Sequence, residues 1–159
     1  IDPFYLTWKA REYDQHTKFI ELAGEVNTSM PDYVVARVAE ALNDDAKSIK
    51  GSKVLLLGMA YKPNVDDDRE SPSYVLTEKL EAKGASVSYN DPYVPEVRLT
   101  REHPQFAGRR SVEIADDYDC ILVATNHAEY GEFDFSSFTC PIVDTRNCVS
   151  SRPVKYYRA

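Results

Sequence analysis

The chain has 159 residues, 43% of them hydrophobic, and a formal net charge of −7 at pH 7. This length suits one domain, and the acidic balance argues against a nucleic-acid or anionic-membrane partner, because either calls for a basic surface. No apolar run approaches the ~18 residues of a membrane span and no leader suggests export, so we expect a cytoplasmic protein.

The chain contains an odd number of cysteines, and none of them has CxxC spacing: Cys120, Cys140 and Cys148. This pattern indicates reduced thiols rather than a zinc site or a disulfide framework, and we expect no bound metal. Cys120 lies within an apolar run and is interpreted as a packing residue, and Cys148 is interpreted as incidental.

Residues 2–43 have the periodicity of a helix. Between Phe19 and Leu42, apolar residues recur at intervals of three and four, which places them on one helical face. Pro31 interrupts the pattern and predicts either a kink or two abutting helices, the second capped by Thr28 or Ser29. A helix over 17–43 would be about 40 Å long. That is longer than a small sheet requires, so the uncovered apolar stripe predicts self-association.

From residue 53 onward, predicted strands and helices alternate. Residues 53–57 and 120–124 are continuous apolar runs, typical of strands covered on both faces, and 86–89 and 141–144 are shorter candidates. Ser71-Pro72 begins a helix and Gly84 ends it, while 91–111 is expected to be an irregular connection. The chain is therefore predicted to be α/β, with a Rossmann-like parallel sheet, helices on both faces and a long helical segment in front.

Three cations follow predicted strands in an otherwise acidic chain: Lys62, Arg69 and Arg146. Ligands of parallel α/β sheets bind beyond the carboxyl ends of the strands, where convergent cations suit an anion such as a diphosphate. His127 also follows a strand and is a further candidate contact. A second interpretation stays open, in which Lys62 and Arg69 only neutralise Asp66–Asp68. The loop has one glycine, Gly58, so it is neither a GxGxxG nor a Walker loop.

Two long segments carry a family resemblance: IDPFYLTWKAREYDQHTKFIELAGEVNTSMPDYV (residues 1–34) and KVLLLGMAYKPNVDDDRESPS (residues 53–73). Together they resemble the UDP-glucose/GDP-mannose dehydrogenase family, and within it the bacterial UDP-N-acetylglucosamine 6-dehydrogenases. The likeness runs from residue 1 to about residue 91 and returns at 120–125 and 143–146.

The resemblance implies a longer enzyme. Family members have an NAD-binding Rossmann domain, a central helical region that pairs two subunits, and a C-terminal UDP-binding domain. They oxidise the C6 alcohol of a UDP-sugar to a carboxylate in two NAD-dependent steps, supplying polysaccharide precursors. The family's cysteine nucleophile would fall three residues before Ile1. We therefore expect a C-terminal part, inactive alone, with a helical segment over 1–50, a UDP-sugar-binding domain over 51–159, and a homodimer formed through the long helix.

The resemblance also implies roles for five residues. Asp2 matches an aspartate that handles water or protons during thioester hydrolysis, although without the resemblance a helix N-cap would be the favoured explanation. The family's contacts with the UDP-sugar match Tyr61, Lys62 and Arg146, and its arginine that contacts NAD matches Arg69.

A different class of function stays open as the alternative, a non-enzymatic nucleotide-binding or receiver-like signalling module. Such a module would use Asp66–Asp68 with Mg²⁺. The acidic groups of a receiver come from different strands, whereas these three are consecutive in one loop, and this disfavours the alternative.

Overall fold

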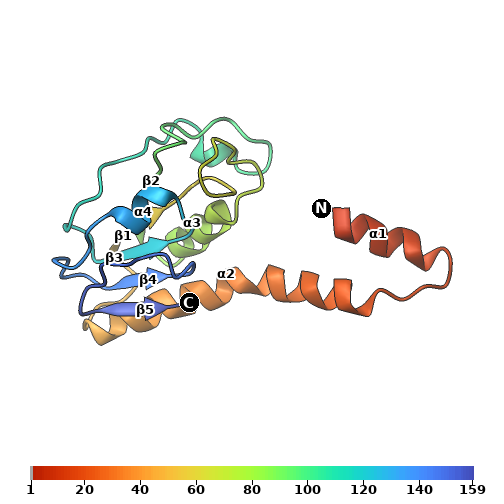
Figure 1. Cartoon of the computed structure of the whole chain (residues 1–159), viewed down its shortest axis with the longest axis horizontal. Coiled ribbons are helices and arrows are strands. Elements are labelled where there is room, and N and C mark those ends of the chain that lie inside the picture. Colours follow the sequence, from red (N-terminus) through yellow and green to blue (C-terminus); the bar gives the residue numbers. More distant parts are fainter. Residues whose placement is uncertain (1) are drawn as a thin grey trace.

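The computed structural model describes residues 2–159, and for Asp2 only the backbone. The chain opens with two helices, α1 (Asp2–Arg11) and α2 (Lys18–Asp44), and α1 folds back along α2 (Figure 1). The intervening turn contains Asp14 at a φ of 53°. Across the pair, Thr17 Oγ1 lies 2.9 Å from Thr7 Oγ1. None of the helices within residues 2–159 combines the length and apolar character needed to cross a membrane.

Pro31 lies inside α2, which continues without interruption from Lys18 to Asp44. The expectation of a second helix capped by Thr28 or Ser29 is therefore wrong. The hydroxyls of these two residues instead donate to backbone carbonyls of the preceding turn, those of Gly24 at 2.8 Å and Val26 at 2.8 Å. A helix tolerates a proline when tertiary packing supports it, and the part of α2 that follows Pro31 is packed on the sheet.

Within residues 2–159, five parallel strands form one sheet in the order β2-β1-β3-β4-β5. The strands are β1 (Lys53–Leu57), β2 (Ser86–Asn90), β3 (Cys120–Val123), β4 (Ile142–Asp144) and β5 (Tyr156–Arg158). The first four confirm the sequence-based prediction to within one residue at either end. The strand β5 was not predicted.

The helices between strands are α3 (Pro72–Ala82) and the short α4 (Ala128–Glu132), and a 3-10 turn spans Pro104–Phe106 in the otherwise irregular 91–111 connection. The predicted boundaries of α3 are confirmed. The Ser71 side chain accepts the Ser73 N–H at 3.3 Å, Pro72 occupies the first turn, and Gly84 follows the C-cap with a φ of 91°.

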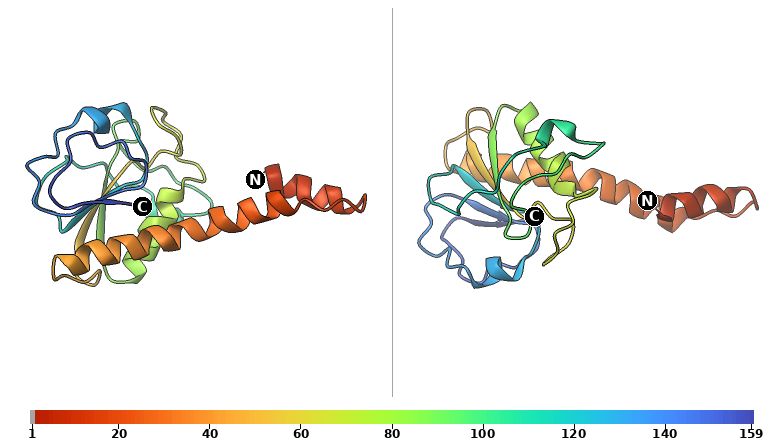
Figure 2. Two further views of the ribbon diagram at one scale, coloured as in Figure 1. Left: turned by 60° about the horizontal axis from the view of Figure 1, so that its bottom comes forward. Right: turned by 90° about the horizontal axis from the view of Figure 1, so that it is seen from above.

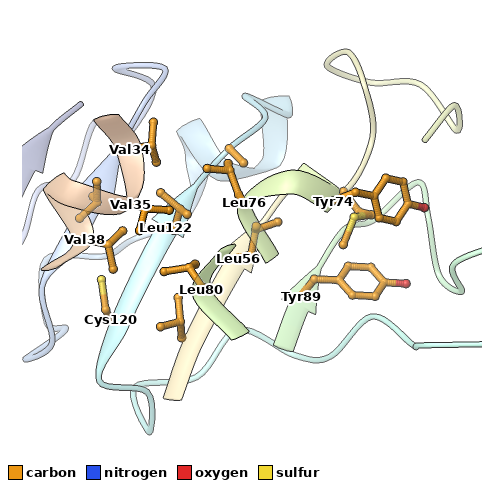
Figure 3. Packing of buried hydrophobic residues seen from close by; sticks show 14 of the residues in the cluster. Val34, Val35, Val38, Leu56, Tyr74, Leu76, Leu80, Tyr89, Cys120 and Leu122 are labelled. Carbon is orange, nitrogen blue, oxygen red and sulfur yellow. The ribbon is translucent and has the colours of Figure 1, made fainter. Parts of the chain in front are cut away.

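Two apolar layers cover the sheet, which explains why its strands are continuously hydrophobic. Alternate side chains of β1 point to opposite faces, so Leu56 and Leu57 belong to different layers. Figure 3 shows α2 contributing Val34, Val35 and Val38 to the first layer, together with residues of α3. The second layer contains Tyr130 of α4 and aromatic side chains of the following loop, including Phe135. The expectation of helices on both faces is confirmed.

The amino-terminal half of α2 extends beyond the sheet (Figure 2). Its buried residues are confined to the carboxyl-terminal half, from Val34 to Leu42. Most large apolar side chains before that point are exposed, and Phe19 is 89% exposed.

Candidate functional site

The strand order places a switch point between β1 and β3. The chain leaves β1 for β2 on one side and returns to β3 on the other. In doubly wound sheets with this order, the crevice at the carboxyl ends of the first and third strands is the ligand site. Here residues 58–71 follow β1 and residues 124–127 follow β3, so these two loops flank the crevice.

Tyr61 and Lys62 stand exposed on the loop after β1. The Tyr61 N–H donates to the carbonyl of Asp67 at 2.7 Å, which closes the loop on itself. The Lys62 ammonium lies 5.1 Å from the centre of the Tyr61 ring, a cation–π distance. The pair therefore presents a positive charge beside a flat aromatic surface.

Arg146 reaches the same edge from the turn after β4. That turn is fixed by the buried Asp144 carboxylate, which accepts the N–H groups of Arg146 at 2.8 Å and Val149 at 3.0 Å. The Arg146 Nε donates to the carbonyl of Ala124, at the end of β3, at 2.7 Å. The terminal nitrogens of its exposed guanidinium make no hydrogen bond within residues 2–159 and can bind an anion.

Arg69 is paired within its own loop. Its Nε donates to Asp67 Oδ1 at 2.9 Å and a terminal nitrogen donates to Oδ2 at 2.8 Å. This bidentate contact lowers the pKa of Asp67 to about 2. The interpretation that a cation neutralises the acidic run therefore holds for Arg69. It does not hold for Lys62, which forms no salt bridge within residues 2–159.

Tyr61, Asp67 and Arg69 line one wall of an open pocket of about 580 Å³. The opposite wall is formed by the 99–102 segment, including Thr100 and Arg101. This wall was not predicted, because it lies in the irregular connection. The cation Arg101, three residues after Arg98, was the available signal in the sequence. Of the four predicted ligand contacts, Tyr61 and Arg69 line this pocket, whereas Lys62 and Arg146 do not.

The three consecutive aspartates do not converge. Asp68 is buried and accepts the Tyr74 hydroxyl at 2.6 Å, whereas Asp67 pairs with Arg69 and Asp66 is exposed, 3.4 Å from Arg98. Among residues 2–159, no group of three histidine, cysteine or acidic side chains is placed to hold a metal ion. Because the strand order is shared with receiver modules, this divergence is what argues against the signalling alternative.

Asp91 and His127, both at strand ends, are interior residues rather than exposed ligands. The Asp91 carboxylate accepts four backbone N–H groups and lies 3.1 Å from Nε2 of His127. Burial raises the pKa of Asp91, but hydrogen bonds from His127 and from backbone N–H groups outweigh it and leave that pKa below its ordinary value. His127 is accordingly not available as a direct ligand contact.

The remaining candidates are Asp2 and the cysteines. Asp2 is the first residue of α1, and its side chain lies outside the described part of the chain. Burial raises the pKa of all three thiols, to about 11 for Cys148 and about 12 for Cys140, and Cys120 is fully buried in β3. Cysteines in such surroundings are poor nucleophiles.

Residues 55–151 match the model of the UDP-binding domain of the UDP-glucose/GDP-mannose dehydrogenase family. The chain is 34% identical, over 155 residues, to the UDP-N-acetyl-D-mannosamine dehydrogenase of Methanococcus maripaludis, covering 92% of this chain and 33% of that protein. It is 28% identical to the UDP-N-acetyl-D-glucosamine 6-dehydrogenase of Salmonella typhi, covering 82% and 30% respectively.

Among solved structures, the UDP-N-acetyl-mannosamine dehydrogenase of S. aureus superimposes with a TM-score of 0.70 at 31% identity, covering 99% of this chain and 36% of that one. The chain thus spans about a third of the length of the curated relatives that it matches. It belongs to the UDP-glucose/GDP-mannose dehydrogenase family, and residues 55–151 correspond to the family's UDP-binding domain.

Proposed function

We propose that this chain is the UDP-sugar-binding part of an NAD-dependent dehydrogenase that oxidises the C6 alcohol of a UDP-hexose or UDP-N-acetylhexosamine to the carboxylate. The product would be a UDP-uronic acid used in polysaccharide synthesis. In this proposal residues 51–159 form the nucleotide-binding unit, and residues 1–50 form the helical segment that joins it to the rest of the enzyme. The relatives carry names of this reaction class and match this chain over most of its length.

One observation carries the nucleotide site. Two exposed cations, Lys62 after β1 and Arg146 beside the end of β3, flank the switch point of a chain whose net charge is −7. Because the chain is acidic overall, the rest of its surface would not attract an anion by charge. A diphosphate between Lys62 and Arg146 would form charge-assisted hydrogen bonds with both. Tyr61 would offer its ring or its hydroxyl to the nucleotide.

NAD fits this chain only in part. Arg69 is exposed at the rim of the open pocket and is the side chain that would contact the cofactor. A dinucleotide loop needs several glycines, and residues 58–71 contain one. The cofactor, which accepts the hydride when bound, would therefore be held mainly by residues outside these 159. Asp2 is proposed to handle a proton or water during thioester hydrolysis.

We also propose that two copies pair through α2. Phe19, Leu22 and Val26 are more than half exposed on the part of the helix that lies beyond the sheet. An apolar stripe of this kind usually marks an interface, and a two-fold contact between identical helices is self-complementary.

Calorimetric titration of UDP into the chain tests the nucleotide site. Lys62→Ala and Arg146→Ala should each weaken binding about ten- to a hundred-fold, because a charged hydrogen bond contributes roughly 1.5–3 kcal/mol. Lys83→Ala is the matched control, since it removes one exposed cation at the C-cap of α3, which lies at the amino edge of the sheet. Equal affinity in wild type and in both site variants would overturn the assignment.

A further inference from the structure

The residues on either side of Tyr61 and Lys62 are held by one buried pair of side chains. On the amino-terminal side, Asp91 Oδ2 accepts the N–H groups of Met59 at 2.7 Å and Ala60 at 2.8 Å. On the carboxyl-terminal side, His127 Nδ1 accepts the N–H of Asn64 at 2.9 Å. His127 and Asp91 are bonded to each other and both side chains are fully buried. They come from the loop after β3 and the end of β2, so the pair joins three strand ends.

The hydrogen bonds of His127 determine which nitrogen of its imidazole carries the hydrogen. A backbone N–H can only donate, so Nδ1 of His127 carries a lone pair. The ring hydrogen is then on Nε2 and donates to Asp91 at 3.1 Å. The neutral ring thus uses both nitrogens, one to hold Asn64 and the other to hold the carboxylate.

Asn64 links His127 to the loop that carries Tyr61 and Lys62. Its backbone has a φ of 61°, in the left-handed region, where asparagine is tolerated at a small cost. Its side-chain oxygen accepts the N–H of Ala128, next to His127, at 3.0 Å. Two hydrogen bonds therefore fix a strained residue two positions after Lys62. Loss of the Nδ1 contact leaves that N–H without its partner and releases the strain.

We propose that His127 is the positioning residue of the nucleotide site, holding Tyr61 and Lys62 toward the ligand through Asn64, and doing so only as a neutral ring. This inference rests on the proposed function, because it takes Lys62 to be a nucleotide contact. A ring that gained a proton at Nδ1 could no longer accept the N–H of Asn64.

The groups that face the ring decide which contact breaks on protonation. They are the Asp91 carboxylate, the Asn64 N–H, the Tyr93 ring at 4.9 Å and the Tyr130 ring at 5.4 Å. The remaining nearby acid, Glu129, is bonded to the Tyr93 hydroxyl. A charged ring keeps and strengthens its pairing with Asp91. At Nδ1, however, two donors would face each other, so the bond to Asn64 is the one that is lost.

Two variants distinguish the role of Nδ1 from that of Nε2 in His127. The side-chain oxygen of His127→Asn lies near the place of Nδ1 and can still accept from Asn64, whereas the amide of His127→Gln can reach Asp91 but leaves Asn64 without an acceptor. Tyr93→Phe is the control, because it keeps the ring contact with His127 and removes only the bond to Glu129.

Binding is measured with UDP-glucose between pH 5.5 and 8, since its diphosphate lacks the terminal phosphate monoester whose second pKa is about 6. At pH 8, His127→Asn and Tyr93→Phe should stay within about threefold of wild type, and His127→Gln should bind at least about tenfold more weakly. Wild type should lose more affinity than His127→Asn toward pH 5.5, because only the histidine can gain a proton at the nitrogen that accepts from Asn64. Equal pH profiles in these two proteins overturn the proposal, even if His127→Gln does not fold.

A ligand-free measurement separates this inference from the proposed function. The Asn64 amide should exchange slowly with solvent at pH 8 in wild type and in His127→Asn, and quickly in His127→Gln. If Lys62→Ala binds UDP-glucose as tightly as wild type, the assigned nucleotide site fails and the amide exchange still decides the role of His127. Slow exchange of Asn64 in His127→Gln overturns the positioning role while leaving the nucleotide site intact.

Discussion

A Cβ atom on Gly58 would lie 2.4 Å from the Cβ of Thr125 and 2.8 Å from the backbone nitrogen of that residue. Gly58 directly follows β1 and Thr125 follows β3, so the two strand ends touch where the ligand crevice opens. Gly58 also has a φ of 94°, which side chains rarely adopt. The single glycine of this loop therefore serves the close approach of two backbones.

Gly58→Ala should destabilise the fold by about 3 kcal/mol or more, because the new methyl group meets backbone that cannot move away. Gly51→Ala is the matched control. Gly51 has a similar φ of 87°, but nothing lies within 4 Å of its Cβ position. It should cost only about 1–2 kcal/mol of backbone strain. Urea unfolding of the two variants measures the difference, and equal losses would contradict the steric explanation.

Asp91→Asn should lower the free energy of unfolding at pH 7 by about 3 kcal/mol, because an amide cannot accept all the hydrogen bonds that the buried carboxylate accepts. The pKa of Asp91 is lowered in the folded state. Its contribution is thus present above the unfolded value of about 3.9 and lost as the pH falls through the lower folded value. The deficit of Asp91→Asn should shrink below about pH 4. The exposed Asp117→Asn serves as the control.

Phe19→Glu and Leu22→Glu should abolish self-association, because a charge in the apolar stripe of α2 would be buried without a partner. Val154→Glu is the control, since Val154 is fully exposed in a loop remote from the stripe in sequence. Sedimentation equilibrium of the four proteins tests the expectation. A wild-type chain that remains monomeric at the highest attainable concentration would contradict it.

Cys148 should react slowly with iodoacetamide in the folded protein. With its pKa raised to about 11, roughly one thiol in several thousand is ionised at pH 7.5. Cys120 and Cys140, which are more deeply buried, should be slower still, and urea should expose all three. Cys148→Ser should leave UDP binding unchanged. Rapid labelling of Cys148 would instead indicate a thiolate that these surroundings do not favour.

The purified chain should form no NADH from NAD and a UDP-sugar. The proposed chemistry needs a cysteine nucleophile, and each of the three thiols is held protonated by burial. Absorbance at the wavelength of reduced nicotinamide measures the rate, and an identically purified Lys62→Ala chain controls for contaminating enzyme, whose activity this substitution would not change. UDP-sugar-dependent NADH from the untreated chain would refute the expectation.

Much of the sheet could be predicted from the sequence, because β1 and β3 bury both faces and are therefore continuously apolar. The strand β5 could not, since Tyr156 and Tyr157 are only half-buried and pair as the sheet's edge with β4. The helix α4 was missed for a different reason. Its five residues include Gly131, and so short a segment has no helical period.

Some residues of the candidate site could likewise be predicted from the sequence, and others could not. Lys62 and Arg146 could be assigned to the carboxyl edge, because their chemistry and their places after strands were visible in the sequence. The interior position of His127 could not be predicted, since its partners Asp91 and Asn64 lie 36 and 63 positions away. Such pairings depend on the register of the strands.

The 27 residues of α2 span about 40 Å, and the packed contacts that hold the helix on the sheet lie in its carboxyl-terminal half. The helix can therefore act as a lever. Its fulcrum lies near Val38, and its far end, at Lys18, is about 30 Å from that point. A tilt of about 5° in the packed half would carry Lys18 through about 3 Å, roughly the width of a side chain. Small changes of packing beneath α2 would thus reach α1 as displacements large enough to rearrange whatever it contacts.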